Sequence, residues 1–197
     1  MMKQNEDIKE DSKVEEVEQI NYMKDIMHMV LYFLVVIAIF GFINIFVGEH
    51  VEVNGSSMES TLQNENHLIL EKVSYRLHEP ERFDVIVFRP FENNKKLYFI
   101  KRIIALPGET VQIKGSDIYI NNKLLKENYG KDPIEDGGIA KDPITLGKDE
   151  YFVLGDNRNN SKDSRFAEVG LVQRDSIIGR TWFRIWPLNE IGVLKHR

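Results

Sequence analysis

Two stretches of the sequence contain residue types that together could perform nucleophilic catalysis. The first is Gly55–Leu62, which contains three serines. A serine hydroxyl needs a base that removes its proton before it becomes a nucleophile. The second is the apolar run Leu97–Gly108, which contains Lys101 and Arg102. Neighbouring residues of a β-strand face opposite sides, so one of these two cations is expected to lie against apolar side chains.

Lys101 is the candidate base, because a lysine can lose its proton when it is desolvated and an arginine cannot. Burial can lower a lysine pKa by about 3–5 units, which brings the neutral amine near working pH. The alternative is that both cations reach water along their aliphatic stems. The serine stretch can also be a Ser/Gly turn. It is not a nucleophile elbow, because Glu59 stands where that motif requires glycine.

A third segment, residues 155–165, is polar and follows the apolar run Tyr151–Leu154. Its hydroxyl, carboxylate and arginine side chains suit a set of hydrogen-bonding partners around a reactive amine. They also suit a polar turn with Asx-type hydrogen bonds. The segment is a poor calcium loop, since Arg158 occupies a ligand position and Ala167 the position of the closing glutamate. The five histidines show no paired spacing, so we expect neither a metal nor another cofactor.

The elements that must position these segments are expected to be mainly β-strands. Beyond residue 48, short apolar runs replace long helical periodicity, and Gly115-Ser116 separates two alternating stretches as in a two-residue hairpin. Lys126–Glu150 is polar, contains Lys-Asp-Pro-Ile twice, and is interpreted as a long surface loop. The predicted strands are His67–Lys72, Asp84–Arg89, Leu97–Leu106, Thr110–Lys114, Asp117–Asn121, Tyr151–Leu154 and Ile177–Ile185.

Met29–Val47 contains 19 residues without a charge, which favours a membrane-spanning helix. The apolar region of a cleavable signal peptide is typically shorter, about 7–15 residues. Lys13 and Lys24 precede the span, and the first lysine or arginine after it is Lys72. The positive-inside rule then places the N-terminus in the cytoplasm. We expect an acidic cytoplasmic tail (1–25), a transmembrane helix in the cell membrane (26–47) and an extracytoplasmic catalytic β-domain (48–197).

The composition excludes several classes of protein. The chain has 197 residues, a formal net charge of −5 and no cysteine. Without cysteine there is no disulfide scaffold, zinc ribbon, iron–sulfur cluster or thiol nucleophile. The negative charge argues against a nucleic-acid binder. About 150 residues beyond the span suffice for one domain with a substantial core.

The ordered set of motifs resembles type I signal peptidases, the membrane-bound Ser–Lys proteases that remove signal peptides. The resemblance extends from the span to about Pro187, and the single span and compact domain look like the shorter Gram-positive-type members. It implies a mainly β fold, an antiparallel β-sheet domain on a single N-terminal transmembrane helix. The matching stretches are Gly55–Met58 with Thr61-Leu62, Asp84–Phe88, Tyr98–Arg102, Leu106–Gly108, Gly155–Arg158, Ser161 and Asp163–Arg165.

The resemblance implies a role for each matched side chain. Ser57 would be the nucleophile and Lys101 its general base, while Ser161 would hydrogen-bond and orient the lysine amine. The supporting polar residues would be Asp163, Arg165, Asp156 and Arg102. The backbone N–H of Ser57 would bind the oxyanion. The substrate would add as a strand, with small −1 and −3 residues in shallow apolar pockets. The matching pocket positions are Val51, Val53, Met58, Leu62, Leu68, Val87, Phe99 and Ile100.

Three positions depart from the family pattern. Gly55 stands where some members have a serine in the oxyanion hole, which leaves the second donor open, while Ser60 replaces a proline and Ala105 a glycine. None removes a catalytic group, so we expect an active enzyme.

The partners of this enzyme would be signal-peptide-bearing preproteins, the lipid bilayer and a nearby secretion translocon, with no nucleic acid. The alternatives are a self-cleaving Ser–Lys repressor domain and a silent, membrane-tethered β-domain that binds partners.

Overall fold

The structure is a computed structural model, and it describes residues 22–41, 48–91, 93 and 97–194. The chain divides into an N-terminal unit, residues 1–45, and a C-terminal unit, residues 46–197. The described part of the first unit is a helix, Tyr22–Gly41, which is long and apolar enough to cross a membrane. Residues 42–47 of the predicted span and residues 1–21 of the predicted tail lie outside the described residues.

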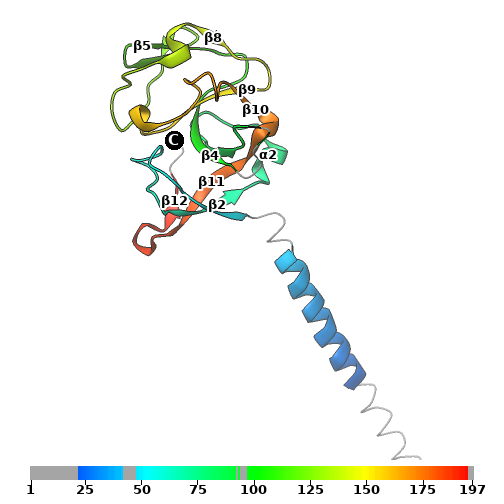
Figure 1. The fold of residues 1–197 in the computed structure, drawn as a ribbon. Helices are drawn as coiled ribbons and strands as arrows, with labels where there is room; N and C mark the ends of the chain where they lie inside the picture. The colour runs from blue at the N-terminus through cyan, green and yellow to red at the C-terminus, as the bar shows by residue number, and fades with distance from the viewer. Residues whose placement is uncertain (1–21, 42–47, 92, 94–96, 195–197) are drawn as a thin grey trace, which may run out of the picture. The chain divides into compact units, whose positions relative to one another are not determined.

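The C-terminal unit contains two antiparallel sheets, with β5 and β8 at one end and β2, β11 and β12 at the other (Figure 1). The larger sheet has the order β1 (Glu49–Glu52), β2 (His67–Glu71), β11 (Ile177–Trp186), β3 (Val85–Phe88), β4 (Phe99–Ala105), β9 (Glu150–Leu154) and β10 (Val172–Gln173), with β12 (Gly192–Val193) beside β11. The smaller sheet has the order β7 (Lys123–Leu124), β6 (Asp117–Ile120), β5 (Thr110–Lys114) and β8 (Ile144–Thr145). The helical turns are α2 (Ser74–Leu77), η1 (Gly138–Lys141), η2 (Arg158–Asn160), η3 (Arg174–Ser176) and η4 (Leu188–Glu190).

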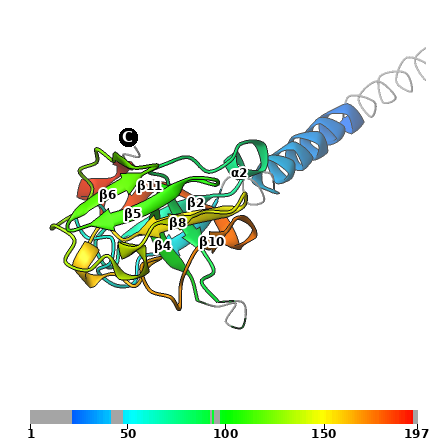
Figure 2. The ribbon, with the colours of Figure 1, turned by 90° about the horizontal axis from the view of Figure 1, so that it is seen from above.

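The smaller sheet follows directly from the alternation of apolar and polar residues. Val111 and Ile113 on β5 face the same core as Ile118 and Ile120 on β6, while the residues between them are more exposed. The turn joins Lys114 to its register partner Asp117 through two residues, of which Gly115 has a φ of 61°. A positive φ favours glycine, so the predicted hairpin is confirmed. Figure 2 shows its strands beside β8.

The central strands of the larger sheet are buried on both faces. All four residues of β3 are buried, and so are the last five residues of β4. On β4, Ile103 packs into one apolar cluster and its neighbour Ile104 into another. A strand with a core on each side needs a continuous apolar run. The same double burial surrounds the two cations of β4.

The mainly β prediction is confirmed, and each of the seven predicted strands has a counterpart whose ends lie within two residues of the prediction. Five strands were not predicted: β1, β7, β8, β10 and β12. They have two to four residues each. Such strands are too short to show a period in the sequence, and the pairing partner decides that they form.

The interpretation of Lys126–Glu150 as a surface loop is wrong. The segment contains η1 and β8, and β8 pairs with β5 through Val111 and Ile144. Three of its apolar side chains are buried in the same cluster as the hairpin, namely Ile134, Ala140 and Leu146. The polar residues between them hide this contribution, because isolated apolar residues in an irregular segment have no period that indicates burial.

Candidate active site

Ser57 lies in a turn that starts after β1 and is anchored by buried apolar residues. Met58 and Leu62 are almost completely buried, and the Leu62 N–H donates to the Met58 carbonyl over 2.8 Å. Gly55 has a φ of 103°, and its N–H donates to Asn64 Oδ1 over 2.8 Å. The turn therefore holds a partly exposed Ser57 directly above a packed apolar base.

The substitution at Ser60 coincides with a special backbone conformation. Ser60 has a φ of 91°, whereas a proline ring holds φ near −65°. The turn in this chain is therefore incompatible with the proline that the family pattern places there. The Ser60 hydroxyl instead donates to the Tyr129 carbonyl over 3.0 Å, which ties the turn to a distant segment.

Lys101 and Ser57 are in direct contact. The Lys101 side chain comes from β4 and is 4% exposed. Its Nζ donates to Ser57 Oγ over 2.7 Å and to the Ile100 carbonyl over 3.0 Å. The same nitrogen lies 5.1 Å from the centre of the Phe99 ring. Burial lowers the pKa of Lys101 from 10.5 to about 8, while the negative charges of Asp163 and Asp156 oppose this shift.

Arg102, the neighbour of Lys101, is also completely buried, so the alternative in which both cations reach water is wrong. Arg102 binds Asp156 with two hydrogen bonds of 2.9 and 2.7 Å. The Thr61 hydroxyl donates to the same carboxylate over 2.5 Å, and the Tyr129 ring covers the guanidinium at 3.8 Å. This network joins the Ser57 turn, β4 and the 155–165 segment at one point.

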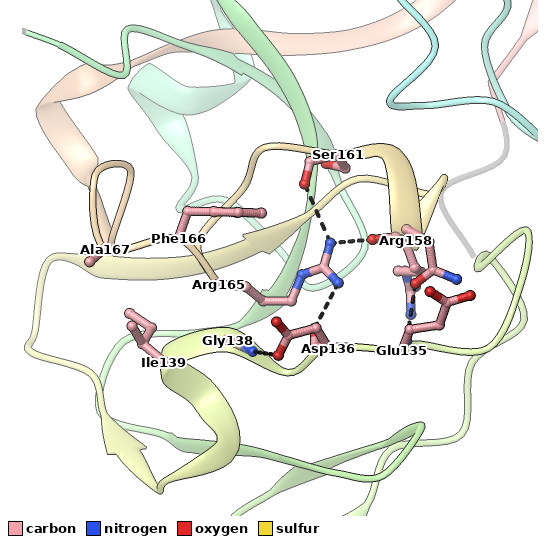
Figure 3. Close-up of a pocket in the computed structure, with 10 residues that line it drawn as sticks. Glu135, Asp136, Gly138, Ile139, Arg158, Ser161, Arg165, Phe166 and Ala167 are labelled. Carbon is pink, nitrogen blue, oxygen red and sulfur yellow. Dashed lines mark hydrogen bonds between the residues drawn. The ribbon is translucent and has the colours of Figure 1, made fainter.

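Asp163 and Arg165 form a second buried ion pair. Arg165 Nε and Nη2 donate to the two Asp163 oxygens over 2.8 and 2.9 Å. Asp163 also accepts the Gly155 N–H over 3.1 Å. Figure 3 shows Arg165 reaching toward the backbone of Asp136 and Arg158. A charge-assisted bidentate pair of this kind fixes the course of the loop.

The predicted hydrogen bond from Ser161 to the Lys101 amine is not formed. The Ser161 hydroxyl is buried and has no hydrogen-bond partner within the described residues. The Lys101 amine is directed instead toward Ser57 and the Ile100 carbonyl. Ser161 nevertheless lies close to the nucleophile, because a Cβ added to Gly155 would collide with both Ser161 Oγ and the Ser57 carbonyl.

A cleft of about 390 Å³ opens beside Ser57 and Lys101. The predicted pocket residues that line it are Val51, Val53, Met58, Phe99 and Ile100. The other three do not line it. Leu62 and Leu68 are fully buried in the apolar cluster beneath Met58, and Val87 is buried within β3. Leu62 and Leu68 pack in the same cluster as Met58 and so support the floor of the cleft from within the core.

Sequence reasoning missed several residues at this site. Leu97, Tyr98 and Lys162 also line the cleft, and Asn157 bonds to the Ser57 turn. Tyr98 lies beside predicted pocket residues, so its position in the apolar run was an available signal. Nothing local marks Asn157 among the polar residues of its loop. Within the described residues, no three His, Asp or Glu side chains gather closely enough to hold a metal ion.

The comparison with known proteins identifies the class of hydrolase. The family described as "Signal peptidase, peptidase S26" matches residues 26–186. "Probable signal peptidase I-2" from Synechocystis sp. is 44% identical over 156 residues, covering 77% of this chain and 69% of the relative. "Signal peptidase I" from Leptolyngbya laminosa is 45% identical over 158 residues (77% and 75%). "Signal peptidase I T" from Bacillus subtilis is 37% identical over 157 residues (76% and 80%).

The chain therefore belongs to the signal peptidase family, a family of serine endopeptidases that cleave signal peptides. The predicted resemblance is confirmed, and so is the prediction of an enzyme. Neither the repressor domain nor the silent binding domain fits this assignment.

Proposed function

We propose that this chain is a membrane-bound serine endopeptidase that removes N-terminal signal peptides with a Ser–Lys dyad. Ser57 acts as the nucleophile and Lys101 as its general base. The observation that carries this proposal is the 2.7 Å contact between Ser57 Oγ and the buried Lys101 Nζ. A hydrogen bond between nucleophile and base is the geometry that this chemistry requires.

The reaction begins with the neutral Lys101 amine, which removes the proton of Ser57 Oγ as this oxygen attacks the carbonyl carbon of the −1 residue. The resulting oxyanion accepts a hydrogen bond from the Ser57 N–H. The C–N bond breaks, and the Lys101 ammonium gives its proton to the leaving amine. Water then attacks the ester with Lys101 as the base again, which frees the signal peptide and Ser57.

The cleft provides the basis for selecting small residues at −1 and −3. Its described lining combines Val51 of β1 and Val53, which directly follows β1, with Phe99 and Ile100 from the start of β4. β1 ends the order of the larger sheet, so its outer edge is available for an added substrate strand. Alternate side chains of that strand, −1 and −3, would face the apolar floor made by Met58.

The supporting residues act through the dyad. The Asp163–Arg165 and Arg102–Asp156 pairs hold the 155–165 segment against β4, and their carboxylates temper the pKa of Lys101. Ser161 is buried beside Gly155, close to the Ser57 carbonyl, and within the described residues its hydroxyl has no hydrogen-bond partner.

The helix Tyr22–Gly41 is proposed to anchor the enzyme in the cell membrane. In this arrangement the N-terminal tail is cytoplasmic and the catalytic domain faces the outside, near the translocon. That topology would present Ser57 on the side where signal peptides emerge. It follows from the lysines that precede the span and from the absence of lysine and arginine between the span and Lys72.

A covalent serine probe built on a signal-peptide sequence tests the proposal. We expect the probe to label the parental chain at Ser57 and to leave Ser57→Ala unlabelled. Lys101→Ala should also remain unlabelled, because the hydroxyl then lacks its base. Mass spectrometry of the labelled peptide identifies the site. Equal labelling of the parental chain and Ser57→Ala would contradict the proposal.

A further inference from the structure

Asn157 contacts both peptide groups that flank the nucleophile. Its backbone N–H donates to the Ser57 carbonyl over 3.0 Å. Its side-chain Nδ2 donates to the Ser56 carbonyl over 3.1 Å. Asn157 is itself buried, and it lies in the loop that also contains the two buried ion pairs. A single residue thus fixes the backbone on each side of Ser57.

The bond to Ser56 determines where the Ser57 N–H points. The carbonyl of Ser56 and the N–H of Ser57 belong to the same planar trans peptide, in which they face opposite directions. Asn157 holds the carbonyl from one side, so the N–H must point to the other. Within the described residues, the Ser57 N–H donates a hydrogen bond to no group. It is therefore free to meet a substrate oxygen.

Gly55, two residues before Ser57, provides no second donor for the oxyanion, so the Ser57 N–H matters more. Gly55 has no hydroxyl to offer, and its own N–H is already occupied by Asn64 Oδ1 at 2.8 Å. A hydrogen bond to the carbonyl of a peptide also polarises that peptide and strengthens its N–H as a donor. Asn157 is thus in a position both to aim and to strengthen the Ser57 donor.

We propose that Asn157 is a positioning residue that aims the Ser57 N–H at the oxyanion of the tetrahedral intermediate. The proposal rests on the proposed function of Ser57 as the nucleophile. An amide is required at this position because an aspartate has no donor for the Ser56 carbonyl. Asn157 itself does not line the cleft, and the Lys101 amine bonds to Ser57 and Ile100 instead.

The test is the cleavage kinetics of full-length Asn157→Ala and Asn157→Asp on a preprotein substrate. Removing an oxyanion donor costs about 10²–10³-fold in kcat, so misaiming it should lower kcat about 10–100-fold. KM should stay within about threefold, because the bond matters only in the transition state. A peptide boronate forms a tetrahedral adduct with Ser57 Oγ, and its affinity should fall by the same factor as kcat/KM. The affinity for an uncleaved signal peptide should not change.

Asn159→Ala is the matched control. The Asn159 carboxamide also makes two hydrogen bonds, with the Pro133 carbonyl at 2.9 Å and the Glu135 N–H at 3.0 Å, neither of them to the Ser57 turn. It should therefore leave kcat unchanged within about threefold, since it loses comparable bonds elsewhere. An equal loss of kcat in Asn159→Ala and Asn157→Ala would overturn the proposal.

A double variant separates positioning from simple packing. Asn157 Nδ2 also donates to Glu59 Oε2 over 3.3 Å. In Glu59→Gln/Asn157→Asp this contact is restored with donor and acceptor exchanged, but the Ser56 carbonyl still has no donor. We expect the double variant to remain as slow as Asn157→Asp, while Glu59→Gln alone stays near the parental rate. Recovery of kcat in the double variant would overturn the proposal.

The pH profile and Ser57→Ala complete the design. The acid limb of the rate should stay in place in Asn157→Ala, because this substitution adds no charge and, among the described residues, the Lys101 amine bonds only to Ser57 and Ile100. A displaced limb, or a kcat within threefold of the parental value, would overturn the positioning role. If Asn157→Ala does not fold, Asn157→Asp and the double variant decide the question. Undiminished cleavage by Ser57→Ala would instead refute the proposed function itself.

Discussion

The two ends of the catalytic domain are built on opposite principles. The core of the smaller sheet is made of apolar side chains from β5, β6 and the 126–150 segment, together with side chains from β4 and β9. The region around β4 and the 155–165 segment buries charged groups instead, namely Lys101, Arg102, Asp156, Arg158, Asp163 and Arg165. Apolar burial needs no direction, whereas a buried charge is costly unless it is paired.

The pairing itself distinguishes one cation from the rest. Arg102 pairs with Asp156, Arg165 with Asp163, and Arg158 with Glu127. Among the described residues, Lys101 is the buried cation that has no carboxylate in contact, since its partners are a hydroxyl and a carbonyl. The paired charges thus fix the course of the backbone in this region. Lys101 has no carboxylate in contact, so no ion pair holds its amine in the protonated form.

The largest expected effect is the loss of that unpaired base. Lys101→Ala and Ser57→Ala should each reduce preprotein cleavage about 10⁴-fold or more, because members of a catalytic unit are lost together. Circular dichroism and thermal melting should show a folded domain, since neither side chain takes part in a buried ion pair. Near-parental activity in either variant would refute the dyad.

Replacing one glycine by alanine in each region, Gly155 in the 155–165 segment and Gly115 in the β5–β6 hairpin, compares the two regions directly. Gly155→Ala should reduce cleavage about 100-fold, because the new Cβ would collide with Ser161 Oγ and the Ser57 carbonyl and displace the nucleophile. Gly115→Ala in the hairpin meets nothing within 4 Å, but its φ of 61° is strained for alanine. It should cost about 1–2 kcal/mol of unfolding free energy with an unchanged rate. Similar rates in both variants would remove the contrast.

The pH dependence of cleavage reports the protonation of Lys101. In the proposed mechanism the active form is the neutral amine, and burial lowers the pKa of Lys101 to about 8. The rate should therefore fall about tenfold per pH unit below about 8 and level off above it. Simultaneous replacement of His50, His67 and His78 by glutamine should leave this limb in place. A limb that moves in the folded triple variant would make a histidine the base.

The smallest expected effect on catalysis comes from the apolar end. Ile113→Ala removes a buried side chain from the core of the smaller sheet. It should lower the unfolding free energy by about 2–5 kcal/mol because of lost burial and an incompletely filled cavity. The kcat measured below the melting transition should remain within about twofold of the parental value. A large loss of kcat at full folding would show that the two ends are coupled.

Elements whose signal is local could be predicted from the sequence. The strands Thr110–Lys114 and Asp117–Ile120 follow from alternation, and a glycine in the turn between them allows the positive φ. The ordered motifs placed Ser57 and Lys101, because the family resemblance depends on residue types at fixed spacings. The uncharged run Met29–Val47 likewise predicted a membrane-spanning helix, and the described helix is Tyr22–Gly41. In these cases the residues that carry the information are close together in the chain.

Tertiary structure alone decided the remaining features. Whether Lys101 and Arg102 reach water depends on the sheets and loops packed over β4, which the strand itself does not reveal. The burial of Ile134, Ala140 and Leu146 depends likewise on where the hairpin lies. Pairing through space also selected Asn157 rather than Asn159 to bond the Ser57 turn, about 100 residues earlier in the chain. Burial and hydrogen bonding depend on distances between segments, and only the folded chain sets those distances.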